Sequence, residues 1–292
     1  MGKARGMVLI GVLWMVAALS LLATGALHAV RAEIRVVTTL KASALAAAHG
    51  DAVLRLAAAT LATPGRPRDR HAVVDMRFDG RLMSVHVIPV SGLVNLNQAS
   101  ESLLVDVFVH AGGLAPEPAR TLAQRVLDWR DPDPTPRPQG AEDPDYEAAG
   151  VAYRTRGARF EVVEDLLQVL GIDFDLYARV APLFTADGNG AGVDPLAATP
   201  EVLWVLARGN ANVVERILSA RRSDGRLADS AGLVADHLGQ PQAARIRLEA
   251  YVPVDDATML IRSHLIDLSP QSDAPLPWRI LGTETRYLAQ AR

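Results

Sequence analysis

An uncharged run at the N-terminus, residues 7–30, constrains this 292-residue chain more than any other feature. It reads MVLIGVLWMVAALSLLATGALHAV and contains no Asp, Glu, Lys or Arg. As an α-helix it spans about 36 Å, whereas a bilayer core requires about 20 apolar residues. We therefore predict a transmembrane helix over residues 7–30. Lys3 and Arg5 precede it, which predicts a cytoplasmic N-terminus and a body on the far side of the membrane.

Two other interpretations of this run remain open. The sequence AVRA at residues 29–32 resembles a signal-peptidase site, but a secretory signal has only about 7–15 apolar residues before the cut. An ordinary signal anchor is consistent with the same residues. The run alone does not separate an anchor from a segment that is cut and still retained.

The rest of the composition indicates a globular body. A net charge of −3 and a pI of about 6.2 argue against a general attraction to nucleic acid. The absence of cysteine excludes disulfides, thiol catalysis and cysteine-bound zinc. Subtracting the membrane helix leaves about 260 residues, enough for one large domain or two smaller ones.

The helical pattern continues beyond residue 30. The segment 31–63 is rich in Ala and Leu, and Pro64 and Gly65 follow it. We predict one helix of more than about fifty residues that ends there. Its apolar residues recur at spacings that predict one buried face, formed by Ile34, Val37, Leu45, Ala48, Ala52 and Leu56.

Strand patterns occur at two separate places in the chain. Alternating residues on both sides of Asp79-Gly80 predict a β-hairpin before residue 90. The ranges 243–252, 258–268 and 278–288 predict three further strands. Short helices with glycine stops fill the intervening segment, 93–239. Because an insertion requires ends that lie close together, we expect the two groups of strands to form one sheet.

Two stretches of the inserted segment resemble each other. Residues 92–104 and 191–203 align at an offset of 99, with Asn95 matching Asp194 and Ser100 matching Thr199. Ser and Thr are preferred helix N-caps. We interpret the pair as a degenerate duplication of a turn followed by a helix.

Several motifs together carry a family resemblance. The start, MGKARG before an apolar helix, resembles a prepilin leader. The segments GLVNLNQAS, LDWRDPDPTPRPQGAEDPDY and FEVVEDLLQVLGI follow in that order. The chain resembles the type II secretion system minor pseudopilin K family, also called general secretion pathway protein K. The recognisable motifs extend to about Leu206, and LDWRDPDP with GAEDPDY is the most specific of them.

The resemblance implies an α+β fold of the pseudopilin type. A long N-terminal transmembrane helix would pack on a small antiparallel sheet, with a large all-α insertion that contains helix-hairpin-helix or SAM-like units. The expected divisions are a leader at 1–6, the transmembrane part of the helix at 7–30, the periplasmic helix and first hairpin at 31–92, the inserted helical domain at 93–239, and the C-terminal strands at 240–292.

The resemblance also implies a non-enzymatic role in protein export. Prepilin peptidase would cut between Gly6 and Met7, and the new N-terminus would be methylated. The protein would be a single-pass inner-membrane protein with a cytoplasmic N-terminus and a periplasmic body. It would initiate or cap the periplasmic pseudopilus at its tip, with minor pseudopilins I and J as partners and exported proteins as further candidates.

One position departs from the pattern of most pseudopilins. They carry Glu at the fifth position after the cut, where it is thought to pair with a neighbouring subunit's N-terminal ammonium, and here that position is Gly11. A membrane-embedded carboxylate is costly without a partner. Loss of the Glu fits a subunit at the tip, which has no neighbour ahead of it. The alternative is that Gly11 is a tolerated small residue.

An acidic segment is the candidate metal site. Alternating prolines predict an extended, solvent-facing loop, and Ca²⁺ requires six to eight oxygen ligands. Family members are associated with calcium. The candidate ligands are Asp128, Asp131, Asp133, Glu142, Asp143 and Asp145. The alternative is a solvated acidic loop without an ion.

The second candidate function is DNA binding by a membrane-tethered protein with helix-hairpin-helix units. The range 161–183 contains one Arg and five acidic residues, which is the wrong balance for phosphate contacts. We therefore expect no nucleic-acid partner. The histidines lack metal-binding spacing on a helix, and no phosphate-binding loop or nucleophile elbow occurs, so we do not expect an enzyme.

Overall fold

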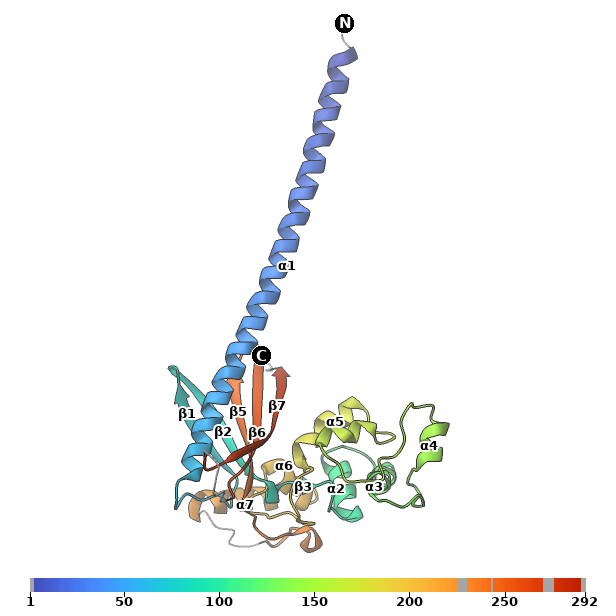
Figure 1. Cartoon of the computed structure of the whole chain (residues 1–292), viewed down its shortest axis with the longest axis vertical. Coiled ribbons are helices and arrows are strands. Elements are labelled where there is room, and N and C mark those ends of the chain that lie inside the picture. The colour runs from blue at the N-terminus through green and yellow to red at the C-terminus, as the bar shows by residue number, and fades with distance from the viewer. Residues whose placement is uncertain (1–2, 225–229, 243, 270–275, 290–292) are drawn as a thin grey trace.

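The computed structural model describes residues 3–224, 230–242, 244–269 and 276–289 (Figure 1). A long helix, α1 (Lys3–Ala62), extends far beyond the rest of the molecule. The C-terminal part of α1 packs on a five-stranded sheet, and this unit is called the sheet body. Residues 90–242 form a second unit beside it, called the helical lobe.

The sheet body contains the strands that the sequence predicts. They are β1 (Ala72–Phe78), β2 (Arg81–Pro89), β5 (Arg245–Pro253), β6 (Thr258–Asp267) and β7 (Arg279–Ala289). Their order is β1-β2-β5-β6-β7, and every neighbouring pair is antiparallel. The two groups of strands therefore join at β2 and β5, and the helical lobe is inserted between these neighbours.

The predicted hairpin is confirmed, together with its turn. Asp79 and Gly80 connect β1 to β2, with φ values of 48° and 72°. Two consecutive residues with positive φ are what a two-residue type I′ turn requires. The turn thus sets the register in which Phe78 faces Arg81.

The predicted long helix is confirmed, but the predicted buried face of α1 is wrong. Ile34, Val37, Leu45 and Leu56 are all exposed, as is Ala48, and Ala52 is only partly buried. The face on the sheet is instead formed by Ala46, Gly50, Val53, Leu54, Ala57, Ala58 and Leu61. Small residues let the helix approach the strands closely: a Cβ on Gly50 would lie 2.7 Å from the Cβ of Arg262. Both faces are apolar, so periodicity did not identify the one that the sheet covers.

The helical lobe has a hydrophobic core of its own, separate from the core beneath α1. Its elements are η1 (Val90–Gly92), β3 (Val94–Asn95), α2 (Glu101–His110), α3 (Pro116–Arg130), α4 (Asp143–Ala148), η2 (Val163–Gln168), α5 (Phe174–Val180), η3 (Ala181–Leu183), β4 (Phe184–Thr185), α6 (Pro200–Leu206), α7 (Ala211–Asp224) and η4 (Ala235–His237). The helix expected from VVEDLLQVLGI is only a short 3₁₀ segment, η2.

The duplicated turn and helix is confirmed in the hydrogen bonds of the helical lobe. The Asn95 side chain accepts from the backbone two residues on, and Asp194 does the same, both at 2.9 Å. Ser100 then caps α2, and Thr199 caps α6, each through a 3.3 Å bond from a backbone N–H. The same local chemistry therefore starts both helices.

The two copies also share a parallel contact with a distant strand. β3 pairs in parallel with β4. At the position equivalent to Val94, Val193 forms a parallel bridge with Leu238. The turn of each copy is thus paired in parallel with a segment that comes much later in the sequence.

Candidate functional site: the exposed face of the long helix and the acidic segment

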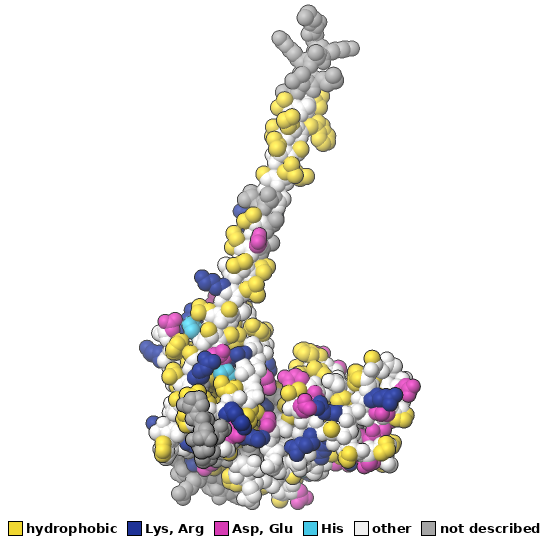
Figure 2. All heavy atoms as spheres, in the orientation of Figure 1, with side chains coloured by type: hydrophobic (Ala, Val, Ile, Leu, Met, Phe, Trp, Pro, Cys, Tyr) yellow, Lys and Arg dark blue, Asp and Glu magenta, His cyan; other side chains and the backbone are white. Residues whose placement is uncertain are grey.

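An unpaired apolar face runs along α1 away from the sheet body. Ile34, Val37, Leu40 and Leu45 are between 47% and 65% exposed. Figure 2 shows hydrophobic side chains along the projecting helix up to the sheet body. Soluble monomers rarely expose contiguous apolar surface of this kind without a partner. This face is therefore a candidate site for packing against other helices.

The predicted membrane span is not confirmed. Within the residues that the structure describes, no helix combines the length and apolarity needed to cross a membrane. The structure describes only the helical backbone of the predicted cleavage residues, Gly6 and Met7. The same holds for several other residues of 7–30. Gly11 is described, and a Cβ there would meet no atom within 4 Å. These predictions stay predictions.

The proline-rich stretch 132–136 is irregular and exposed, as the prolines predict, but the expectation that all six predicted calcium ligands lie in this loop is wrong. Asp128 belongs to α3 and has no exposed surface, and Glu142 is also buried. Asp143 and Asp145 are in the first turn of α4. Only the stretch 131–142 is irregular.

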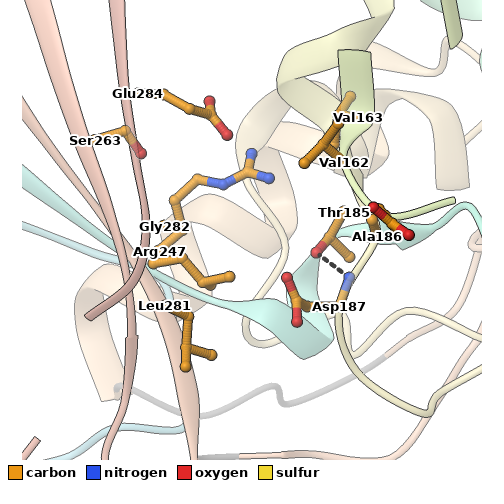
Figure 3. Close-up of a pocket in the computed structure, with 12 residues that line it drawn as sticks. Val162, Val163, Thr185, Ala186, Asp187, Arg247, Ser263, Leu281, Gly282 and Glu284 are labelled. Carbon is orange, nitrogen blue, oxygen red and sulfur yellow. Dashed lines mark hydrogen bonds between the residues drawn. The ribbon is translucent and has the colours of Figure 1, made fainter. Parts of the chain in front are cut away.

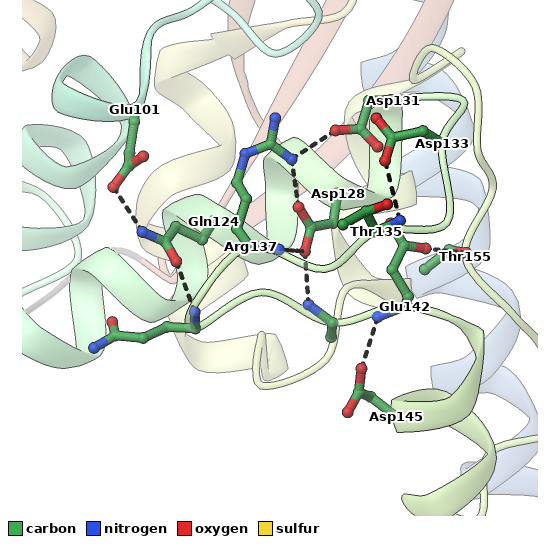
Figure 4. A network of polar contacts seen from close by, with 12 residues as sticks. Glu101, Gln124, Asp128, Asp131, Asp133, Thr135, Arg137, Glu142, Asp145 and Thr155 are labelled. Atoms are coloured by element: carbon green, nitrogen blue, oxygen red, sulfur yellow. Dashed lines mark hydrogen bonds and ion pairs between the residues drawn. The ribbon is translucent and has the colours of Figure 1, made fainter.

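Arg137 is the reason why the acidic segment folds inward (Figure 4). Its guanidinium forms ion pairs with Asp128 and, at 2.6 Å, with Asp131. The second carboxylate oxygen of Asp128 accepts from the backbone N–H groups of Arg137, at 3.1 Å, and Ala141, at 2.9 Å. A buried charge is tolerated when it is paired and hydrogen-bonded in this way. The sequence analysis overlooked Arg137 because it considered only the acidic residues.

The remaining acidic residues also have protein partners. Asp133 accepts from Thr135 N at 3.0 Å, and Asp145 accepts from Glu142 N at 2.9 Å. Thr155 bonds to both Glu142 and Asp143. Among the described residues, no group of three His, Cys, Asp or Glu side chains is arranged to hold a metal ion.

Two oxygens in this segment nevertheless lack partners. Asp131 Oδ1 and Glu142 Oε1 are buried and make no hydrogen bond to any residue that the structure describes. Burial raises the pKa of Glu142, and the charges of Asp128, Asp131 and Asp143 raise it further, although a bond from Thr155 opposes them. Unsatisfied carboxylate oxygens among like charges are the donor chemistry that suits a hard cation.

A groove between the helical lobe and the sheet body is a site that the sequence analysis missed. Figure 3 shows Arg247 and Glu284 reaching from the sheet toward Val163 of η2. One cavity of about 120 Å³ and a second of about 580 Å³ share these three residues. The groove is created by tertiary packing of segments that lie far apart in the sequence, so no local motif marks it.

Comparison with known proteins finds similarity to one family, over part of the chain. Residues 92–187 match the family model described as type II secretion system (T2SS), protein K. The type II secretion system protein K of Pectobacterium carotovorum subsp. carotovorum is 43% identical over 68 residues, which cover 23% of this chain and 21% of the relative. The protein of the same name from Pseudomonas aeruginosa is 28% identical over 156 residues, 50% of this chain and 46% of the relative.

The fold is also similar to a solved structure. A chain in the crystal structure of the GspK-GspI-GspJ complex from the type 2 secretion system of enterotoxigenic Escherichia coli superposes with a TM-score of 0.53 at 16% identity. The match covers 88% of this chain and 98% of that one. The chain spans less than half the length of the two curated relatives above. In its motif region this chain is therefore similar to the type II secretion system protein K, and in its fold it is similar to a chain of the GspK-GspI-GspJ complex.

Proposed function

We propose that this chain is a minor pseudopilin of a type II secretion system, a structural component placed at the tip of the periplasmic pseudopilus, which initiates or caps its assembly. The observation that carries the proposal is the unused apolar face of α1, which projects from a body that has already buried its own cores. Helices of other subunits would cover that face. The helical lobe stands to one side of the helix axis, where it would prevent another subunit from adding above it (Figure 1).

The partners in this proposal are minor pseudopilins I and J. The similar fold in a complex whose title names GspI and GspJ supports the choice. The test is co-purification with these two proteins after replacement of Val37 and Leu45 by Lys. We expect the double variant to lose the partners, because two buried ammonium groups would be unpaired in the helix interface. Thr39→Lys is the matched control, since Thr39 is an exposed residue of the same helix.

The proposal includes processing and membrane insertion. Prepilin peptidase would cut between Gly6 and Met7, and the helix from Met7 onward would be held in the inner membrane before assembly, with the body in the periplasm. The length and apolarity of residues 7–30 support this. Mass spectrometry of the membrane protein tests it. A mature N-terminus at methylated Met7 is the expected result, whereas an intact Met1 or a start near Arg31 would contradict it.

The domain divisions at residues 31, 93 and 240 are part of the same proposal. The helix-hairpin-helix resemblance expected from the sequence lies on residues 92–100 and 161–182, and the second range contains only η2 and the short α5. We infer instead two helix-hairpin-helix units, α2 with α3 and α6 with α7. Gly113 and Gly209 have left-handed backbone conformations, with φ of 73° and 76°, and support these units because they provide the turns between the paired helices.

The DNA-binding alternative gains no support from the comparisons, and we assign no reaction to the chain.

We further propose a calcium ion in the acidic segment, held by Asp131 and Glu142 with additional oxygens of the same segment. The two unpaired buried oxygens support it. Thermal unfolding with calcium and with a chelator is the test, using Glu142→Gln. Wild type should be stabilised by calcium, whereas the variant should be insensitive to it. The variant should also be at least as stable as wild type in chelator, because the raised pKa of Glu142 means that its ionised form costs stability above that pKa. An equal response of both proteins to calcium would contradict the site.

A further inference from the structure

The groove between the helical lobe and the sheet body has one regular wall, the outer strand β7. In the register of the sheet, Glu284, Ser263 and Glu249 are neighbours across three strands, as are Arg286, Ile261 and Tyr251. Cross-strand neighbours share a face. This face points at η2 and α5 of the helical lobe, whose residues form the opposite wall of the 580 Å³ cavity.

The outer edge of β7 is free. β7 is the last strand in the order β1-β2-β5-β6-β7, and no strand in the described ranges pairs with its far side. It is 11 residues long, and such an edge presents unpaired N–H and C=O groups to solvent. An extended peptide can add to an edge of this kind by main-chain hydrogen bonds. Its alternate side chains would then continue the face that points at α5.

The charges in the groove favour a basic side chain. Both arginines on the sheet wall are already engaged: Arg247 donates to Phe184 O at 2.6 Å and Arg286 to Glu249 at 2.9 Å. Glu284 and Glu164, in contrast, make no hydrogen bond or ion pair with the described residues. The charges of Arg247 and Arg286 act on Glu284, but in the described part of the chain neither arginine forms an ion pair with it, and Arg286 pairs with Glu249 instead. Figure 2 shows acidic side chains along the notch between the two units.

The surroundings of Glu284 strengthen its preference for a cation. Glu284 is exposed at the rim of the groove, where partial desolvation raises its pKa. Arg247 and Arg286 oppose this, and the charges of Glu164 and Glu249 raise the pKa again. A cation placed between these two exposed carboxylates would relieve their mutual repulsion.

An apolar patch lies in the same cavity. Phe174 is 69% exposed although it stacks near Tyr177, with ring centroids 6.3 Å apart, and Leu288 on β7 is 49% exposed. Exposed aromatic rings beside a groove are typical anchors for a partner's apolar side chain.

We propose that the groove binds an extended segment of another protein, which pairs with the free edge of β7, places a Lys or Arg between Glu164 and Glu284, and packs an apolar side chain on Phe174. This site is separate from the helix interface of the proposed function. Peptide binding to the groove can be tested with the purified full-length chain in detergent, without any pseudopilin partner. Failure of the groove proposal would therefore leave the proposed helix interface untouched, and the reverse also holds.

The test uses fluorescence anisotropy with labelled nonapeptides. The probe has a central lysine, mixed aliphatic residues two positions before and after it, and threonine elsewhere. A second peptide has glutamate at the centre, and a third has the lysine with N-methyl groups on the amides that would face β7. We expect the lysine peptide to bind at least about tenfold more tightly than either of the others.

Variants on the protein side complete the test. Glu284→Lys should weaken the lysine peptide about tenfold and reverse the preference toward the glutamate peptide. Glu147→Lys, the same charge change on α4 outside the groove, should have no effect. Equal binding of the lysine and glutamate peptides, binding that survives N-methylation, or no binding at all would overturn the proposal. Concentration-dependent self-association of the chain that Glu284→Lys abolishes would also overturn it, because the occupant would then be a second copy.

Discussion

The sheet body and the helical lobe provide hydrogen-bond partners for their buried backbone N–H and C=O groups in different ways. In the sheet body, regular strands and α1 pair their own N–H and C=O groups, and the core beneath α1 consists of aliphatic and small side chains. In the helical lobe, irregular segments run between the helices, and buried polar side chains form hydrogen bonds with their backbone. Asn97, for example, accepts from Phe160 N and donates to Phe160 O and Ala186 O.

The comparison shows how the buried acidic side chains of this chain should be interpreted. Irregular backbone inside a core requires side-chain partners, because unpaired buried groups are costly. Asp128 meets that requirement and is explained without a ligand. Glu142 Oε1 does not, which is why it supports the calcium proposal. Each polar contact therefore has to be checked before an acidic segment is assigned as a site.

The largest effect should come from Asp128→Ala. It removes both the ion pair with Arg137 and the acceptor of two backbone N–H groups, so we expect a loss of about 3–5 kcal/mol in the free energy of unfolding. Urea unfolding followed by circular dichroism measures it. Asp133→Ala, an exposed residue that accepts one backbone bond, should cost less than about 1 kcal/mol. Similar losses for both would contradict the distinction between buried and exposed acidic residues of the helical lobe.

Leu54→Ala tests the sheet body in the same way. Leu54 is fully buried beneath the strands, so its truncation should cost about 2–5 kcal/mol through lost burial and the cavity left behind. Leu56→Ala lies two residues away on the exposed side of α1 and should be nearly neutral. If Leu56→Ala were the more damaging variant in the isolated chain, the observed packing face of α1 would be wrong.

The junction between the two units should be sensitive to pH. His71, whose backbone N–H donates to Leu196 O of the helical lobe, has its pKa lowered from 6.5 to about 4, first by burial and then by the charges of His86 and Arg221. The unfolded chain therefore binds more protons between these values. Stability should be fully present above about pH 6.5 and fall by up to about 3 kcal/mol as the pH drops toward 4. His71→Asn should flatten this part of the profile, and an unchanged slope would exclude His71 as its source.

The smallest effects sharpen the comparison between the duplicated units. Ser100→Ala and Thr199→Ala each remove a side-chain cap with the same 3.3 Å geometry, so each should cost about 1 kcal/mol. The double variant should lose about the sum, because the two caps share no partner. Calorimetry of the four proteins measures this. A large cost at one site alone would show that the copies no longer play equivalent roles.

Some features of the chain follow from its sequence alone because they depend on neighbouring residues. Asp79-Gly80 determines its hairpin, Pro64 and Gly65 end α1, and Ser100 and Thr199 start α2 and α6. The repeat at an offset of 99 and the family resemblance rest on the same local information. The leader, the membrane span and the calcium ligands remain predictions.

Other features required the tertiary structure because they depend on contacts between distant residues. Only packing decided which apolar face of α1 meets the sheet, because both faces have helical periodicity. The pairing of β2 with β5 brings together segments on either side of the whole helical lobe. Arg137 turns the acidic segment inward, and the groove beside β7 exists only once the lobe stands against the sheet. No local pattern carries this information, since each feature is set by the free energy of burying one part of the chain against another.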